Sequence, residues 1–248
     1  MTSRLGPAGE AVGFLTIGGG ASVPSPSSVR WFPLVGALIG AALAAIWWAA
    51  DQMFSPLVSA VIVITADAAI TGMLHFDGLA DSADGLLPHM ERSRRLEVMS
   101  APDIGAFALV VVVLVLLLRV GAVASMELDT AVVAGLIALW STSRAAMGSI
   151  MRTVPYARSS GLASAFARPP SALPVGVIVA IGAVGIVALD DPGRQVLRLC
   201  TALAGAVVAA IVVALVARRR LGGYTGDVLG AAGVVAETMG LIVLSANW

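Results

Sequence analysis

Apolar runs of about 20 residues recur along almost the whole chain, and short polar connections separate them. As a helix, which rises about 1.5 Å per residue, each run is long enough to cross a hydrocarbon layer about 30 Å thick. The pattern predicts an all-α, polytopic integral membrane protein with about seven transmembrane helices in a single domain, 1–248. The predicted spans are 31–50, 56–76, 104–125, 130–151, 171–189, 196–217 and 228–246.

The first thirty residues contain only a short apolar piece, 12–17, followed by three glycines and a Pro/Ser stretch. We expect a loop or an interfacial segment there, because the piece is too short for the apolar region of a signal peptide. A different helix count stays open if 104–151 forms one hairpin or re-entrant pair.

Arginines are divided unequally between the two sides of the predicted bundle. Since basic residues accumulate in cytoplasmic loops, the side with most arginines is expected to face the cytoplasm. The amino terminus is then inside and the carboxyl terminus outside. The arginines assigned to the inner side are Arg4, Arg30, Arg92, Arg94, Arg95, Arg152, Arg158, Arg168, Arg218, Arg219 and Arg220.

The composition agrees with a lipid bilayer as the main surrounding medium. Hydrophobic residues make up 58% of the chain and charged residues 12%, whereas a soluble domain has about 25% charged residues. The formal net charge is zero, which argues against a nucleic-acid partner. One cysteine excludes a disulfide within the chain.

Three aspartates, Asp77, Asp81 and Asp84, occur within eight residues at the inner end of the second predicted span. If that span continues as a helix, all three carboxylates project from one face. Such a cluster of like charges is tolerated when a cation lies among them, and hard oxygen ligands indicate Mg²⁺ or Mn²⁺. A solvated acidic helix end is the alternative. His75 lies on the opposite face, so we expect a packed or interfacial histidine unless the helix breaks before Asp77.

A second polar cluster, 218–227, joins the sixth and seventh predicted spans. Gly222 and Gly223 allow the backbone to approach a ligand, and we expect Asp227 to cap the last span, whose first amides could receive a phosphate oxygen. The loop after the fourth span carries Arg152 and Arg158 and no acidic residue, which suits a phosphate group. For both segments, an anchor that only fixes orientation is the alternative.

Charged residues also lie inside the predicted spans. Arg144, Asp67 and Glu237 must pair or line a polar cavity at that depth, and together they predict a cavity that opens inward. We expect Arg119 to snorkel outward.

Taken in order along the chain, these segments resemble the adenosylcobinamide-GDP ribazoletransferases, also called cobalamin 5′-phosphate synthases. The run from His75 to Gly85 is highly specific for that family, and the Gly-Gly-x-Thr-Gly-Asp run is moderately specific. The matching segments are Phe14-Leu15-Thr16, Phe32-Pro33-Leu34-Val35-Gly36, the run from His75 to Gly85, Ser143-Arg144, Pro155-Tyr156-Ala157-Arg158 with Gly161-Leu162, and the run from Leu221 to Asp227 with Leu229-Gly230-Ala231.

The resemblance implies a Mg²⁺-dependent enzyme of a bacterial cytoplasmic (inner) membrane whose active site faces the cytoplasm. It would transfer the cobinamide-phosphate group of adenosylcobinamide-GDP to α-ribazole or α-ribazole 5′-phosphate and release GMP. Homo-oligomerisation and association with other cobalamin-assembly enzymes stay open. By resemblance, the catalytic residues are Asp77, Asp81, Asp84 and Arg144, with the three aspartates holding the metal, and the substrate-binding residues are Arg158, Gly222, Gly223, Thr225 and Asp227.

Two other functions share features of this pattern. A CDP-alcohol phosphotransferase also uses an aspartate-rich helix and a divalent metal, but the Ala-Arg pair of its motif is absent after Asp77-Gly78. A transporter could use Asp67, Arg144 and Glu237 as an ion path, and it predicts broken helices and inverted repeats. No such repeat is visible in the sequence.

Overall fold

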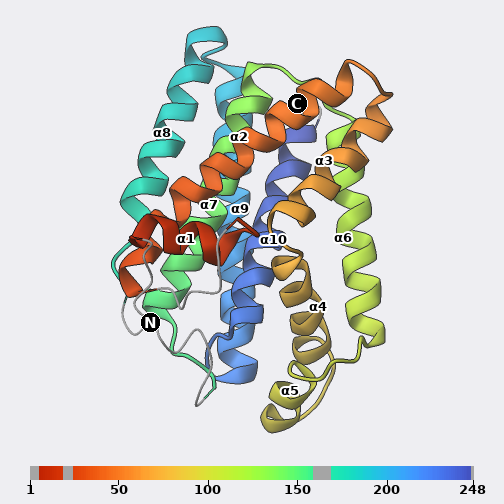
Figure 1. The fold of residues 1–248 in the computed structure, drawn as a ribbon, viewed down its shortest axis with the longest axis vertical. Helices are drawn as coiled ribbons and strands as arrows, with labels where there is room; N and C mark the ends of the chain where they lie inside the picture. Colours follow the sequence, from red (N-terminus) through yellow and green to blue (C-terminus); the bar gives the residue numbers. More distant parts are fainter. Residues whose placement is uncertain (1–5, 19–24, 159–168, 247–248) are drawn as a thin grey trace.

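The computed structural model describes residues 6–18, 25–158 and 169–246, and the elements named within them are helices (Figure 1). A short helix α1 and a 3₁₀ helix η1 precede the first long helix. The elements are α1 (Pro7–Leu15), η1 (Pro26–Trp31), α2 (Phe32–Asp51), α3 (Pro56–Ile70), α4 (Leu74–Leu86), α5 (Arg92–Val98), α6 (Ala106–Ala124), α7 (Thr130–Thr153), α8 (Leu173–Asp190), α9 (Arg194–Leu221) and α10 (Gly226–Ser245).

The prediction of an all-α membrane protein with about seven spans is confirmed. Among the described residues, six helices are long and apolar enough to cross a bilayer, and the pair α3 and α4 makes a seventh crossing if it is counted as one span. The region 104–151 forms two separate helices, α6 and α7, so it is not a single re-entrant unit. Of the two expectations for the initial segment, the loop is wrong for 7–15, which form α1, and the interfacial segment stays a prediction.

The second predicted span is not one continuous helix. It breaks between Ile70 and Leu74, and the two halves are bent by 89°. Gly72 and Met73 have φ values of 60° and 59°, and Met73 is the left-handed residue that precedes α4. The amide of Ile17, just after α1, donates to the carbonyl oxygen of Ile70 at 2.9 Å, so the amino-terminal segment lies against this break.

Helices α7 and α10 form the centre of the bundle, whereas α6 and α8 lie on its outside (Figure 1). Small residues permit the close contact of α2 with α7. A Cβ atom on Gly40 would lie 2.5 Å from the carbonyl oxygen of Leu136, so only glycine fits there without moving the helices apart. Gly36 belongs to the same contact, because a Cβ atom there would collide with the carbonyl oxygen of Trp140 on α7.

The aspartate-rich helix α4 packs against the start of α10 through two other glycines. A Cβ atom on Gly78 would lie 2.7 Å from the carbonyl oxygen of Asp227, and one on Gly230 would lie 3.1 Å from the Cα atom of His75. This crossing brings Asp77 and Asp81 on α4 close to Asp227 on α10. In Figure 1, α5 and the turn between α9 and α10 lie at the same lower end of the bundle, while the α8–α9 turn lies at the upper end.

We expect Gly78→Ala to destabilise the protein by about 1–3 kcal/mol, the usual penalty for forcing extra atoms into a packed contact. The measurement is thermal unfolding of the detergent-purified protein. Gly121→Ala is the matched control, because a Cβ atom at Gly121 meets nothing within 4 Å. Equal unfolding temperatures for the two variants would contradict the close α4–α10 contact.

Candidate active site

The acidic face of α4 has two accessible carboxylates. Asp77 is exposed and Asp81 is half-buried. Among the neighbouring carboxylates, Asp227 and then Asp77 have the strongest electrostatic repulsion on the carboxylate of Asp81, and the guanidinium of Arg158 attracts it. The structure thus brings Asp77, Asp81 and Asp227 together with one arginine, although they come from three parts of the chain.

The third aspartate of the motif has a different role in this structure. Asp84 is only 9% exposed. Its Oδ2 accepts a hydrogen bond from the amide of Gly105 at 2.6 Å, and its Oδ1 accepts one from the amide of Ala108 at 2.9 Å. Both oxygens therefore satisfy amides at the start of α6, which would otherwise lack partners. Within the described residues, no three His, Cys, Asp or Glu side chains are grouped as a metal site, and the assignment of Asp84 as a ligand stays a prediction.

Removal of this cap gives a direct test. We expect Asp84→Ala to lower the stability of the protein by about 0.5–2 kcal/mol, as for other lost helix caps, with Asp84→Asn closer to the wild type because its amide oxygen still accepts a hydrogen bond. Thermal unfolding in detergent measures both. If Asp84→Ala unfolds at the wild-type temperature, the capping role is wrong.

Arg158 and Asp227 form an ion pair at the start of α10. Arg158 Nη2 lies 3.1 Å from Asp227 Oδ2, with the two side chains 29% and 23% exposed. The expected cap of the last span is wrong by two residues, because the amide of Val228 donates to the hydroxyl of Thr225, and Thr225 precedes the first helical residue. Asp227 is consequently left free to hold Arg158.

Two loops are joined beside this ion pair. The amide of Tyr224 donates to the carbonyl oxygen of Pro155 at 2.9 Å, and the amide of Ala157 donates to that of Tyr224 at 2.8 Å. Gly222 has a φ of 77° at the end of α9, and a Cβ atom on Gly223 would collide with the carbonyl oxygen of Pro155. The glycines predicted to approach a nucleotide thus serve first to let the two loops pair. The other residues of that family segment, Gly161 and Leu162, lie outside the described residues.

The two tyrosines in these loops are packed against each other, with ring centroids 5.3 Å apart. Burial, together with the neighbouring Tyr156, raises the pKa of Tyr224 to about 12. Burial also raises the pKa of Tyr156. Both phenols are therefore neutral near pH 7 and contribute packing rather than charge to the site.

Arg144 does not reach the acidic face of α4. Its side chain is 1% exposed, and its Nη1 lies 2.6 Å from Glu237 Oε1. The hydroxyl of Ser143 donates to the same oxygen at 2.7 Å. Arg144 is thus held inside the bundle, and any influence it has on the reaction passes through the helices that it joins.

Arg119 lies in the same buried network, and the expectation that it snorkels outward is wrong. Its side chain is 0% exposed and forms ion pairs with Asp67 at 2.7 Å and Glu237 at 2.5 Å. Asp67 also accepts a hydrogen bond from the indole of Trp140 at 2.9 Å. Two arginines and two carboxylates thereby join α3, α6, α7 and α10. The predicted inward-opening cavity is replaced by closed ion pairs, which also leaves a transporter path without open polar groups at these residues.

His75 is buried, 4% exposed, and neither of its ring nitrogens has a hydrogen-bond partner among the residues that the structure describes. The chain does break before Asp77, at Gly72 and Met73, so His75 lies in the first turn of α4 and not within a continuous span.

Sequence reasoning missed the arginines that hold the other end of α4. Arg95 Nη1 donates to the carbonyl oxygen of Gly85 at 2.7 Å, and Arg220 Nη1 donates to that of Leu87 at 3.0 Å. The sequence shows these two arginines only as part of the positive charge that predicts the orientation of the protein in the membrane.

Comparison with known proteins decides between the alternatives. The family model for cobalamin-5-phosphate synthase matches residues 11–245. The chain belongs to the cobalamin-5-phosphate synthase family. As a member of it, the chain is an enzyme of the transferase class.

Curated relatives agree with the family assignment. A protein of Alkalilimnicola ehrlichii named adenosylcobinamide-GDP ribazoletransferase is 38% identical, over 89% of this chain and 86% of its own length. Relatives with the same name from Bradyrhizobium diazoefficiens and Roseiflexus sp. are 33% and 32% identical, over 86% and 96% of this chain and 81% and 89% of their own lengths. No solved structure matches the chain at a significant level.

Proposed function

We propose that this synthase transfers the cobinamide-phosphate group of adenosylcobinamide-GDP to a ribose hydroxyl of α-ribazole or α-ribazole 5′-phosphate. The hydroxyl oxygen forms a bond to the phosphorus that bears the cobinamide, the bond from that phosphorus to the bridging oxygen breaks, and GMP leaves. The names of the relatives support these substrates. The observation that carries the proposal is the convergence of Asp77, Asp81 and the Arg158–Asp227 pair at one site.

The residues fit a bound Mg²⁺ ion. Mg²⁺ in nucleotide enzymes is usually held by one or two carboxylates together with substrate phosphates and water, and Asp77 and Asp81 present oxygen ligands that no arginine pairs with in the described residues. Asp77 and Asp81 would hold the ion. When bound, Mg²⁺ would neutralise charge on the diphosphate and on the leaving phosphate.

Arg158 is the residue best suited to bind a phosphoryl oxygen. Its guanidinium is partly exposed, and its Nη2 donates to one Asp227 oxygen and to the carbonyl oxygen of Met99, which leaves the Nη1 donors available to the substrate. Asp227 positions this arginine, and the paired loops fix both residues beside α4. The attacking hydroxyl must lose its proton, and one of the three neighbouring carboxylates, Asp77, Asp81 or Asp227, would accept it.

We place the protein in the bacterial cytoplasmic membrane with this site facing the cytoplasm. The arginine-rich connections support that orientation: Arg92, Arg158 and Arg220 donate to the carbonyl oxygens of Ala157, Met99 and Leu87, which follow α7, α5 and α4. Nucleotides are also available on that side.

The test is GMP release from adenosylcobinamide-GDP by the purified protein, with each acceptor in turn. We expect release to require both an acceptor and Mg²⁺ and to stop when EDTA is added. Turnover of α-ribazole but not its 5′-phosphate, or the reverse, would identify the acceptor. Release of CMP from a CDP-alcohol without any GMP release, or Mg²⁺-independent ion flux in vesicles, would contradict the proposed reaction.

A further inference from the structure

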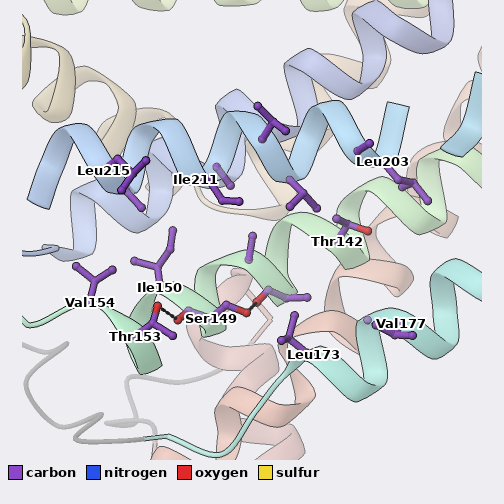
Figure 2. Close-up of a pocket in the computed structure, with 18 of the residues that line it drawn as sticks. Thr142, Ser149, Ile150, Thr153, Val154, Leu173, Val177, Leu203, Ile211 and Leu215 are labelled. Atoms are coloured by element: carbon purple, nitrogen blue, oxygen red, sulfur yellow. Dashed lines mark hydrogen bonds between the residues drawn. The ribbon is translucent and has the colours of Figure 1, made fainter. Parts of the chain in front are cut away.

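A groove of about 790 Å³ lies between α7, α8 and α9, away from the acidic face of α4. Figure 2 shows Leu203, Ile211 and Leu215 of α9 along one wall, Ser149 and Thr153 of α7 across from them, and Leu173 and Val177 of α8 at the side. Helix α8 packs chiefly on α7 and makes little contact with α9. The groove is the space left between those two helices.

The lining offers carbon atoms and almost no hydrogen-bonding groups. The hydroxyl of Ser149 donates to the carbonyl oxygen of Ala145 at 2.8 Å, and that of Thr153 donates to Ser149 at 2.7 Å, so their hydrogens are already used within α7 (Figure 2). The ligand that such a surface recognises is a hydrocarbon, because it makes no demand for polar partners.

The position and length of the groove fit a chain of the surrounding lipid. The lining residues of α9 run from Leu203 to Arg218, which is about 22 Å along a helix axis, against about 15 Å for one leaflet of hydrocarbon. The neighbouring outer surface consists of lipid-exposed side chains, such as Ile178 and Ile181, which are 69% and 66% exposed. The groove is therefore continuous with the region that acyl chains occupy.

One end of the groove carries a positive charge. Arg218 is the only charged lining residue among those described for the groove, and no ion pair within the described residues includes it. It lies in the last turn of α9, at an end of a spanning helix, which is the level of the lipid head groups. A guanidinium binds phosphate oxygens through two parallel hydrogen bonds.

We propose that the groove between α7, α8 and α9 binds an acyl chain of a membrane phospholipid whose phosphate group pairs with Arg218. The apolar wall selects the hydrocarbon, and the arginine at its end distinguishes a phospholipid from an uncharged lipid. The bound lipid would fill the gap between α8 and α9 and hold α8 against the bundle.

Native mass spectrometry of the full-length, delipidated protein tests this binding. The probes are phosphatidylglycerol and a diacylglycerol with the same chains. We expect one phosphatidylglycerol per chain at saturation. Arg218→Gln should weaken phosphatidylglycerol binding about tenfold, the effect of one lost charge-assisted interaction, and leave diacylglycerol binding unchanged. Arg219→Gln is the matched control, since Arg219 does not line the groove, and it should bind like the wild type.

Groove-filling variants test the apolar part. Ala180→Phe on α8 and Val208→Phe on α9 should each abolish the bound lipid, whereas Ile181→Phe, which adds an aromatic ring outside the groove, should keep it. Thermal unfolding shows which variants are folded, and two variants on separate helices keep the test decisive if one fails to fold. The proposal would be overturned if a folded filling variant retained the lipid, or if Arg218→Gln and Arg219→Gln lost equal affinity for it. It would also be overturned if the protein were a dimer that Ala180→Phe dissociates, because a second copy would then occupy the groove.

Discussion

Asp81→Asn is expected to reduce GMP release from adenosylcobinamide-GDP by at least about 100-fold, which is the order of loss seen when one electrostatic group of an active site is removed. The change keeps the size of the side chain and removes its charge. Asp81 is close enough to Asp77, Asp227 and Arg158 to interact with all three electrostatically, so loss of its charge would weaken metal binding and leave Arg158 with fewer opposing charges. The measurement is the initial rate at saturating Mg²⁺, with folding checked by thermal unfolding.

Asp84→Asn is the matched control for that variant. It is the same chemical change one turn further along α4, at a side chain that accepts hydrogen bonds from Gly105 and Ala108. We expect it to retain turnover within about threefold of the wild type, because an effect on stability below about 2 kcal/mol leaves the enzyme folded. If folded Asp84→Asn is as inactive as Asp81→Asn, the three-aspartate metal site predicted from the sequence is restored.

Arg119→Leu is expected to produce the largest loss of stability, about 3–5 kcal/mol, because it leaves Asp67 and Glu237 buried without their shared partner. The free energy of unfolding in detergent measures the effect. Arg94→Leu removes an ion pair of similar length, 3.0 Å, from a surface where both side chains are more than 60% exposed. Its expected effect is about 0–1 kcal/mol.

A double variant separates the ion pair from the general loss of packing. Asp67→Leu combined with Arg119→Leu removes a carboxylate together with its counter-ion, so it should be less destabilised than the sum of the two single variants. Strict additivity would mean that the 2.7 Å contact between these side chains contributes nothing to stability.

The helical spans were predictable because lipid requires each backbone amide to be satisfied within its own segment. Hydrophobic length alone then locates the helices to within a few residues, as for α2 and α6. The break at Gly72 was missed for the same reason: the residues on both sides of it are apolar, and length does not distinguish a straight span from a bent one. Gly72 with its positive φ was the available signal.

The site was predictable only where the deciding contacts are local. Helical periodicity places Asp77, Asp81 and Asp84 on neighbouring positions, but the amides that engage Asp84 belong to residues 21 and 24 positions later. The direction of Arg119 was equally hidden, because its partners lie 52 and 118 positions away. A charged residue inside a span indicates that a partner exists, and only the fold identifies it.

The buried charges also constrain how the chain enters the membrane during its synthesis. Asp67 can pair with Arg119 once α6 is made, but Arg144 lacks its ion-pair partner until Glu237, in the last helix, is complete. Each unpaired charge in hydrocarbon disfavours stable insertion. A chain truncated before α10 would leave Arg144 without its counter-ion inside the membrane. We expect such an incompletely assembled bundle to be degraded by membrane proteases.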